Sequence, residues 1–426
     1  MSEPTWPELL GSKNWDGLLD PLNDDLRRLI LFCGDLCQAT YDTFNNDRSS
    51  PYCGSSRYGK HDFFKKVAFE AAAESYRVSC FLYATARVDV PDDFLIKSLS
   101  REAWSRESNW IGYIAVSDDE ASAASGRRDI RVAWRGTTRS LEWIDVLHPT
   151  LESIGPLLSE EAPPTHEKAA DAHHWYDGLL GGLSGKRDED DDDNNKPKVM
   201  KGWYEIYTSD DEKSPFTKKS ARDQLLTKIK ELVEVYKDEN LSITLTGHSL
   251  GACLAVLSAF DIVENELNKA QFPVCAVVFG CPQVGNAAFK ERVKRHQNLR
   301  VIHVRNEIDV IPRYPSELLG FKDTGTELVI DTRKSPYLKD SRNPSDWHNL
   351  QAMLHIVAGW NGKGGEFGLR ERRGVALVNK SCAFLKEECL VPEMWWVEKN
   401  KGMVLCEDGE WRVLPPKEED LPVPEF

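Results

Sequence analysis

The sequence predicts an α/β fold in which a mostly parallel central sheet is covered by helices on both faces. Between residues 220 and 306, helical patterns alternate with short apolar runs that predict strands. Those runs are "LSITLTG" (241–247), "VCAVVFG" (274–280) and "LRVIHVRN" (299–306). Because such strands are apolar on both faces and are joined through helices, they favour parallel pairing between two helical layers.

Helical patterns separate these strands. The segment "SARDQLLTKIKELVEVYKDEN" places its apolar residues on one helical stripe, and Ser220 with Asp223 forms an N-terminal capping pair. The segment "SLGACLAVLSAFDIVENEL" (249–267) predicts a helix whose early glycine and alanine residues allow close approach to the preceding strand. A further helix is predicted at "FKERVKRH" (289–296).

The first third of the chain predicts more helices and the start of the sheet. Apolar residues recur at helical spacing in "DPLNDDLRRLILFCGDLCQATYDTF" (20–44), and a second helix is predicted across "HDFFKKVAFEAAAES" (61–75). The apolar, β-branched runs "WIGYIAVS" (110–117) and "DIRVAWRG" (129–136) predict strands on either side of a turn-rich segment.

Changes in composition indicate the domain organisation. Residues 155–197 are rich in Pro, Gly, Ser and His and end in "KRDEDDDDNNK", which lacks the spaced ligands and the glycine of an EF-hand calcium loop. We therefore expect an acidic surface insertion there. We expect residues 1–100 to form a helical segment packed on an α/β domain of residues 101–400 that carries the insertion, and 401–426 to form a C-terminal strand and tail. Three tryptophans near the tail are expected to close the core, with contact to a membrane interface as the alternative: Trp395, Trp396 and Trp411.

The charge of the chain excludes some partners. A net charge of −15 argues against nucleic acid as a partner and against purely electrostatic attachment to anionic lipid, since both need a basic face. No apolar stretch approaches the roughly 20 residues that span a bilayer. The N-terminal "MSEPTWPELLGSKNWDGLL" lacks the layout of a signal peptide, so we expect a cytoplasmic protein.

The ten cysteines are scattered and form no C-x-x-C pair. Several lie in apolar runs, so we expect reduced, buried thiols. Cys33 and Cys37 share a helix face, but two further zinc ligands are missing nearby. We expect neither a metal nor an organic cofactor.

The stretch Gly247-His248-Ser249-Leu250-Gly251 matches the pattern G-x-S-x-G between a predicted strand and a predicted helix. In that pattern the serine occupies a sharp turn, and the glycines relieve crowding around it. The alternative is a tight turn that needs only its glycines. A serine hydroxyl is a weak nucleophile near neutral pH, so a nucleophilic Ser249 requires a histidine base and a carboxylate that orients the histidine.

Asp309 is the preferred carboxylate and His348 the preferred base. Asp309 follows a predicted parallel strand, at the sheet edge where ligand-binding groups gather, and Glu307 is the weaker candidate. His348, in "SDWHNLQAM", opens a predicted helix, whereas His355 lies in an apolar run that favours a core histidine.

Two upstream histidines receive other roles. His248 is expected to pack against, or contact, the loop that carries Asp309. His303, inside a predicted buried strand, is expected to be structural.

An oxyanion formed in acyl transfer needs two backbone N–H donors. One is the N–H of Leu250, the residue after the nucleophile at the positive end of the helix. The second is expected from the loop after strand 129–135, where Thr137 follows Gly136. The hydroxyl of Thr137 is a further candidate.

Together, "RGT" (135–137), "GHSLGACLA", "FGCPQVGN", "NEIDVIPR" and "HNLQAMLH" resemble the motifs of the class 3 lipases in order and approximate spacing. The opening "WPELLGSKNWDGLLDPLNDDLRR" and "ATYDTF" resemble the plant phospholipase A1 branch that has no plastid transit peptide. The resemblance covers about residues 6–400. It implies the α/β-hydrolase fold and hydrolysis of the sn-1 ester of glycerophospholipids at a membrane or micelle surface.

The resemblance also implies roles for residues. Ser249, Asp309 and His348 match the catalytic triad of the family, and Thr137 matches its oxyanion residue. Related lipases carry a lid after the oxyanion strand, which corresponds here to "TRSLEWIDVLHP" (138–149). The side chains that would form its apolar face, against an ordinary packed helix as the alternative, are Leu141, Trp143, Ile144 and Leu147.

Two other functions remain open at this stage. The triad implies acyl transfer and says little about the head group, so neutral glycerides or galactolipids are alternative substrates. A lipase-like signalling scaffold without turnover is the alternative outside enzyme chemistry. Acyl-chain preference and oligomeric state are not encoded in any motif that we identify.

Overall fold

The computed structural model describes residues 3–87, 95–97, 99, 108–137, 149–158, 196–396, 403–413, 421–422 and 424. Its centre is a seven-stranded sheet in the order β1-β2-β3-β6-β7-β9-β11. The strands are β1 (Tyr76–Ala84), β2 (Asn109–Ser117), β3 (Arg128–Trp134), β6 (Leu241–His248), β7 (Val274–Phe279), β9 (Leu299–Asn306) and β11 (Thr326–Ile330).

Five of the seven strands run parallel. The pairs β3/β6, β6/β7, β7/β9 and β9/β11 are parallel, whereas β1 and β2 extend one edge in antiparallel fashion. The predicted mostly parallel sheet is therefore confirmed. Strands β6, β7 and β9 lie where the apolar runs predict them. No strand is predicted at β1 or β11.

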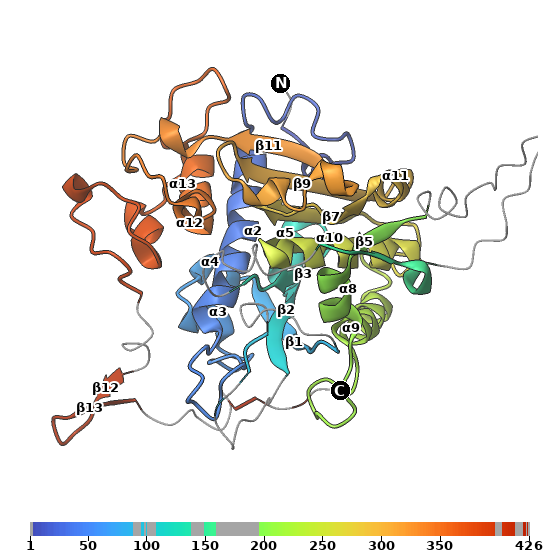
Figure 1. The fold of residues 1–426 in the computed structure, drawn as a ribbon, viewed down its shortest axis with the longest axis horizontal. Coiled ribbons are helices and arrows are strands. Elements are labelled where there is room, and N and C mark those ends of the chain that lie inside the picture. Colours follow the sequence, from blue (N-terminus) through green and yellow to red (C-terminus); the bar gives the residue numbers. More distant parts are fainter. Residues whose placement is uncertain are drawn as a thin grey trace, which may run out of the picture.

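Helices cover both faces of the sheet (Figure 1). One face packs against α8 (Lys201–Thr208), α9 (Ala221–Val235) and α10 (Leu250–Glu264), and the other packs against α2 (Asp24–Thr43) and α13 (Leu350–Gly359). Alternate residues of β7 pack on opposite faces of the sheet. Ala276 and Val278 belong to the core under α10, while Cys275, Val277 and Phe279 belong to the core under α2 and α13. This alternation explains why the whole strand is apolar.

The N-terminal hundred residues contribute to the same sheet. Strand β1 pairs with β2, and an aromatic cluster that includes Phe63 and Tyr113 packs beneath these two strands. The single helix predicted across 61–75 is wrong. The chain forms two short helices, α3 (Phe63–Lys66) and α4 (Glu70–Ala73), because Ala68 between them has a φ of +56°, which ends the first helix.

The remaining elements surround this body. The further helices are α1 (Trp6–Leu9), α5 (Asp119–Ser125), α11 (Ala287–Arg295) and α12 (Pro344–Trp347). A small sheet contains β4 (Leu151–Ser153), β5 (Lys198–Met200), β8 (Gly285–Asn286) and β10 (Phe321–Lys322). Strands β12 (Met403–Leu405) and β13 (Trp411–Val413) form an antiparallel pair near the C-terminus. Six short 3-10 helices complete the described part: Gly155–Leu157, Ile311–Arg313, Glu317–Leu319, Thr332–Lys334, Val375–Lys380 and Glu387–Cys389.

Several predicted features fall outside the described residues. These are most of the acidic insertion, at 159–195, and the candidate lid residues Leu141, Trp143, Ile144 and Leu147. All ten cysteines lie inside the described part, and no disulfide joins any of them. Within the described residues, no helix has both the length and the apolar character that a bilayer crossing requires.

Candidate active site

Ser249 occupies a strained turn between β6 and α10. Its φ is +57° and its ψ is −125°, a backbone conformation that L-residues seldom adopt. The flanking glycines make the turn possible: a Cβ on Gly247 would lie 2.0 Å from the carbonyl oxygen of Gly251, and a Cβ on Gly251 would lie 2.4 Å from that of Trp134. The turn is anchored by the Ser249 N–H, which donates to the carbonyl of Phe279 at 3.0 Å.

His348 and Asp309 form a buried pair. The distance between His348 Nδ1 and Asp309 Oδ2 is 2.6 Å, and the side chains are 5% and 0% exposed. The other carboxylate oxygen accepts the N–H of Ile311 at 3.0 Å, which fixes the carboxylate plane. An ionised carboxylate only accepts hydrogen bonds, so Nδ1 of His348 carries the proton and Nε2 is left as the basic nitrogen.

Two polar atoms at this site are buried and have no hydrogen-bond partner among the residues that the structure describes. They are Oγ of Ser249 and Nε2 of His348. Both residues contact the end of β7: Ser249 bonds to Phe279, and a Cβ on the next residue, Gly280, would lie 2.7 Å from Cε1 of His348. The backbone of Ser249 and the imidazole of His348 thus contact the same dipeptide, and the hydroxyl and Nε2 each lack the bond that the other could supply.

The weaker candidates lie in other environments. Glu307 is exposed and forms an ion pair with Arg333. His355 is buried in α13, where its Nε2 bonds to Oγ of Ser335 at 2.8 Å, and burial lowers its pKa to about 4. His303 is also buried, its Nε2 accepts the N–H of Cys281 at 2.9 Å, and burial lowers its pKa to about 4. These are the environments of structural residues.

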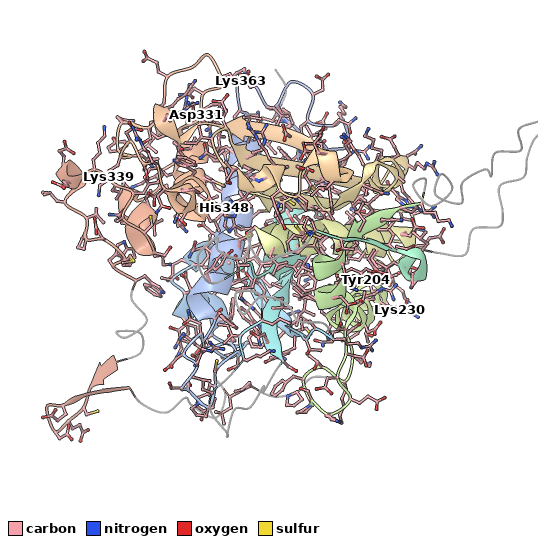
Figure 2. All side chains as sticks on the ribbon, in the orientation of Figure 1. Tyr204, Lys230, Asp331, Lys339, His348 and Lys363 are labelled. Carbon is pink, nitrogen blue, oxygen red and sulfur yellow. The ribbon has the colours of Figure 1, made fainter. Side chains whose placement is uncertain are left out.

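His248 is buried, and both of its ring nitrogens are bonded. Its Nε2 lies 2.8 Å from the main-chain oxygen of His348. Its Nδ1 lies 2.8 Å from the hydroxyl of Tyr41 in α2. The two histidine rings are 4.6 Å apart between centroids, and Figure 2 shows His348 where the C-terminal helices meet α2. Tyr41 lies 207 positions from His248 in the sequence, so no local motif marks it as a partner.

The candidate oxyanion residues come from two elements, the start of α10 and the loop after β3. Leu250 is the first residue of α10, so its N–H belongs to the four that a helix leaves without an intrahelical partner. Thr137 follows β3 in a nearly buried loop. The guanidinium of Arg135 holds that loop by donating to the carbonyls of Trp110 and Gly136, each at 3.0 Å.

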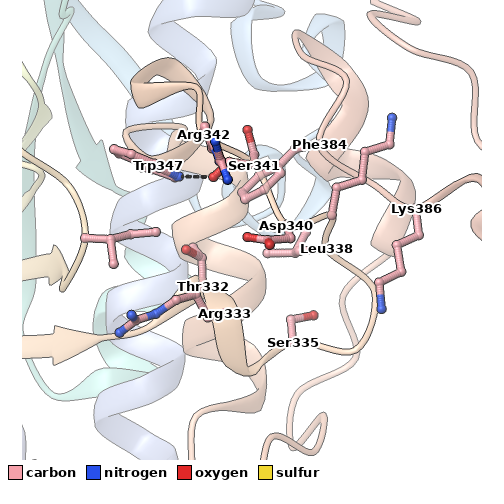
Figure 3. A pocket seen from close by; sticks show the side chains of 12 residues that line it. Thr332, Arg333, Ser335, Leu338, Asp340, Ser341, Arg342, Trp347, Phe384 and Lys386 are labelled. Atoms are coloured by element: carbon pink, nitrogen blue, oxygen red, sulfur yellow. Dashed lines mark hydrogen bonds between the residues drawn. The ribbon is translucent and has the colours of Figure 1, made fainter.

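A cavity of about 550 Å³ adjoins the acid and the base (Figure 3). Two of its lining residues, Ile308 and Trp347, immediately precede Asp309 and His348. The Trp347 indole donates to the carbonyl of Ser341 at 2.8 Å and closes one wall. No triad candidate lines this cavity, so an occupant would touch the neighbours of the acid and the base rather than the reacting atoms. Its lining is Ile308, Thr332, Arg333, Ser335, Leu338, Lys339, Asp340, Ser341, Arg342, Trp347, Phe384 and Lys386.

Comparison with known proteins places this chain in a family. The chain is 59% identical over 423 residues to "Phospholipase A1-IIdelta" of Arabidopsis thaliana, covering 99% of this chain and 98% of that protein. It is 54% identical to "Phospholipase A1-II 5" of Oryza sativa subsp. indica, covering 98% and 84%. The model of the family "Lipase (class 3)" matches residues 131–319. The chain belongs to the class 3 lipase family. Within it, this lipase belongs with the plant phospholipases A1 of class II.

Solved structures are more distant from this lipase. The nonglycosylated LIP2 lipase of Yarrowia lipolytica is 16% identical, with a TM-score of 0.43, and the match covers 73% of this chain and 82% of that one. The native propeptide complex of Rhizomucor miehei lipase is 17% identical, with a TM-score of 0.39, covering 77% and 80%.

Proposed function

We propose that this class 3 lipase cleaves the sn-1 ester of glycerophospholipids through Ser249, His348 and Asp309. The observation that carries the proposal is the buried 2.6 Å pair of His348 and Asp309, together with an unpartnered Nε2 and an unpartnered Ser249 hydroxyl at the same sheet edge. The names of the class II relatives, which are phospholipases A1, support the choice of substrate.

Acylation begins with proton transfer. Nε2 of His348 accepts the proton of Ser249 as Oγ attacks the ester carbonyl, and Asp309 stabilises the imidazolium that results. The negative charge on the carbonyl oxygen is held by the backbone N–H groups of Leu250 and Thr137. The dipole of α10 adds to this stabilisation, because its positive end points toward the oxyanion.

Release of the first product follows from the same groups. His348 returns its proton to the departing glycerol oxygen, so lysophospholipid leaves and the fatty acyl group stays on Ser249. His348 then deprotonates a water molecule that attacks the acyl-enzyme. Fatty acid leaves, and Ser249 regains its proton.

The setting of the reaction completes the proposal. The substrate is taken from a membrane or micelle surface. Ten cysteines without a disulfide support a reducing compartment, and we propose the cytoplasm.

Defined lipids test the function. The purified protein is incubated with phosphatidylcholine that carries different acyl chains at sn-1 and sn-2, and the released fatty acid and lysolipid are identified by mass spectrometry. The expected products are the sn-1 fatty acid and the 2-acyl lysolipid. Parallel incubations with diacylglycerol and galactolipid test the alternative substrates, and faster release from either one would overturn the phospholipid assignment.

Substitution of the nucleophile tests the mechanism. Ser249→Ala is expected to lower kcat by roughly 10⁶, because a triad works as a unit. Its melting temperature should stay near that of the wild type, since the hydroxyl has no partner among the described residues. Ser345→Ala, at an exposed position in α12, is the matched control and should retain full activity. Turnover by the Ser249→Ala variant at the wild-type rate would exclude Ser249 as the nucleophile.

A further inference from the structure

Helix α2 supplies a residue to the site, although it lies outside the matched family region 131–319. Its Tyr41 hydroxyl bonds to Nδ1 of His248 at 2.8 Å and packs directly against the backbone of Gly136. Nε2 of His248 bonds to the main-chain oxygen of His348 at 2.8 Å. A packing contact and two hydrogen bonds therefore link the candidate oxyanion loop to the main chain of the candidate base.

The donors and acceptors in this chain have one consistent assignment. A carbonyl oxygen only accepts, so the bond to His348 requires the proton of His248 on Nε2. Burial lowers the pKa of His248 well below its usual value, so the ring is neutral and Nδ1 is an acceptor. The Tyr41 hydroxyl then donates to Nδ1.

Close packing holds Tyr41, His248 and the loop at Gly136 together. A Cβ on Gly136 would lie 2.1 Å from the Tyr41 hydroxyl and 2.4 Å from the carbonyl oxygen of His248, so the loop already lies as near to both as backbone atoms allow. Tyr41 is fixed in turn, because Cys37, one turn earlier in α2, bonds to Thr246 of β6 at 3.0 Å. Helix α2 is thus anchored on the strand that leads to Ser249.

We propose that Tyr41 and His248 are positioning residues that fix the separation between the oxyanion loop at Thr137 and the general base His348. The inference rests on the proposed function. The two parts must act on one carbonyl group at the same moment, one on its oxygen and the other on the attacking hydroxyl. A displacement of about 1 Å between such groups lowers a rate by roughly a hundredfold, so residues that fix this separation contribute to the rate.

Tyr41→Phe removes the hydroxyl and keeps the ring. On the soluble ester p-nitrophenyl butyrate, we expect kcat to fall roughly tenfold to a hundredfold while KM changes less than about threefold. Labelling of Ser249 by a fluorophosphonate should slow by a similar factor, because the tetrahedral adduct needs both the base and the oxyanion donors. The matched control is Tyr113→Phe, since the Tyr113 hydroxyl donates to the Leu36 carbonyl of α2 at 2.9 Å without reaching the site. Its kcat should remain within twofold of the wild type.

Variants of His248 separate positioning from packing. His248→Gln keeps an N–H donor and an acceptor, whereas His248→Phe keeps a ring without either, so we expect the glutamine variant to retain more kcat than the phenylalanine variant. The double variant Tyr41→Phe/His248→Phe should lose no more kcat than His248→Phe alone, because one chain of bonds is being broken in both.

The outcomes distinguish this inference from the proposed function. If Tyr41→Phe keeps kcat within twofold, or if the two His248 variants lose kcat equally, the positioning role is wrong while the triad stands. Additive losses in the double variant would also overturn it. If Tyr41→Phe does not fold, the comparison of the two His248 variants decides. Wild-type turnover by Ser249→Ala would instead remove the proposed function itself.

Discussion

The two edges of the central sheet carry buried polar clusters of opposite character. At the amino edge, the carboxylate of Asp129 accepts the hydroxyls of Tyr76 and Ser242, each at 2.9 Å, and pairs with Arg131 at 2.5 Å. At the carboxyl edge, Ser249 Oγ and His348 Nε2 have no partner among the described residues. In the first cluster both oxygens of the carboxylate are bonded within the protein, although Nε of Arg131 has no partner among the described residues. In the second, the reacting hydroxyl and imidazole are themselves the atoms without a partner.

The contrast teaches which cluster contributes stability and which contributes chemistry. An unsatisfied buried polar atom costs about 1 to 3 kcal/mol, so a fold tolerates such atoms where another molecule completes their bonds. Ligands of parallel α/β sheets bind at the carboxyl edge, where loops leave the strands. The unpartnered atoms of Ser249 and His348 lie at that edge. We therefore expect substitutions at the two edges to have different effects, on turnover at one and on folding at the other.

The largest effect is expected from Asp309→Asn at the carboxyl edge. The amide is nearly the same size as the carboxylate, but its NH₂ group opposes the N–H at Nδ1 of His348 and favours the other tautomer. Loss of the orienting carboxylate lowers kcat by roughly 10⁴ in triad enzymes. Initial rates on a soluble ester measure the loss, and thermal unfolding should show only a small change. A variant with kcat within tenfold of the wild type would contradict the assignment and return Glu307 to consideration.

The amino edge should respond in the opposite way. Asp129→Asn removes the charge that compensates Arg131, whose side chain is 4% exposed. Removing one partner of a buried ion pair destabilises a protein by about 3 to 5 kcal/mol. Chemical denaturation should show that loss, while kcat per folded molecule on a soluble ester stays unchanged. The control is Asp25→Asn, because Asp25 pairs with the exposed Arg28, and such surface pairs contribute about 1 kcal/mol or less. Equal stability of the two variants would contradict the comparison.

The sequence predicts the candidate reacting residues at the carboxyl edge better than it predicts the residues that hold them in position. Ser249 is marked by a five-residue motif, and Asp309 by its place after a strand. Both signals are local, and the structure places His348 beside Asp309. The contact between Tyr41 and His248 spans 207 positions, so no local pattern encodes it. The bond from His248 to the main chain of His348 is not encoded locally either, since neighbouring strand ends offer several loops to one side chain.

In the fold, too, features encoded by local sequence are predicted and features set by tertiary packing are missed. Strands β6, β7 and β9 are buried on both faces, so their apolar runs predict them, whereas β1 lies at an edge and starts with the partly exposed Tyr76 and Arg77. The helix predicted across 61–75 is interrupted at Ala68, where the packing of the aromatic cluster outweighs the helical propensity of the segment. Propensity is a local quantity, and tertiary packing overrides it.

The smallest effect is expected from a single buried histidine in acid, on the carboxyl side of the comparison. The buried histidines His248, His303 and His355 are on that side, and burial lowers the pKa of each, to about 4 for His303 and His355. The amino-edge cluster of Tyr76, Asp129, Arg131 and Ser242 contains no histidine.

The direction of the effect follows from proton binding. An unfolded histidine takes up a proton as pH falls through about 6.5, but a folded one with a pKa of about 4 stays neutral, so the unfolded chain binds more protons and stability falls with falling pH. The stability is fully present above pH 6.5 and is lost as pH falls toward 4. At pH 5 each such histidine should lower the free energy of unfolding by about 2 kcal/mol relative to pH 7.

Chemical denaturation at pH 7 and pH 5 measures this loss. In His355→Gln the fall between the two pH values should be smaller by about 2 kcal/mol, since one titrating group is gone. His61→Gln is the control, because the His61 side chain is 89% exposed, and its fall should equal that of the wild type. Carboxylates with ordinary pKa values titrate mainly below pH 5, so they add little in this window. An identical fall in His355→Gln and in the wild type would show that the buried imidazoles do not carry the acid sensitivity of the carboxyl side.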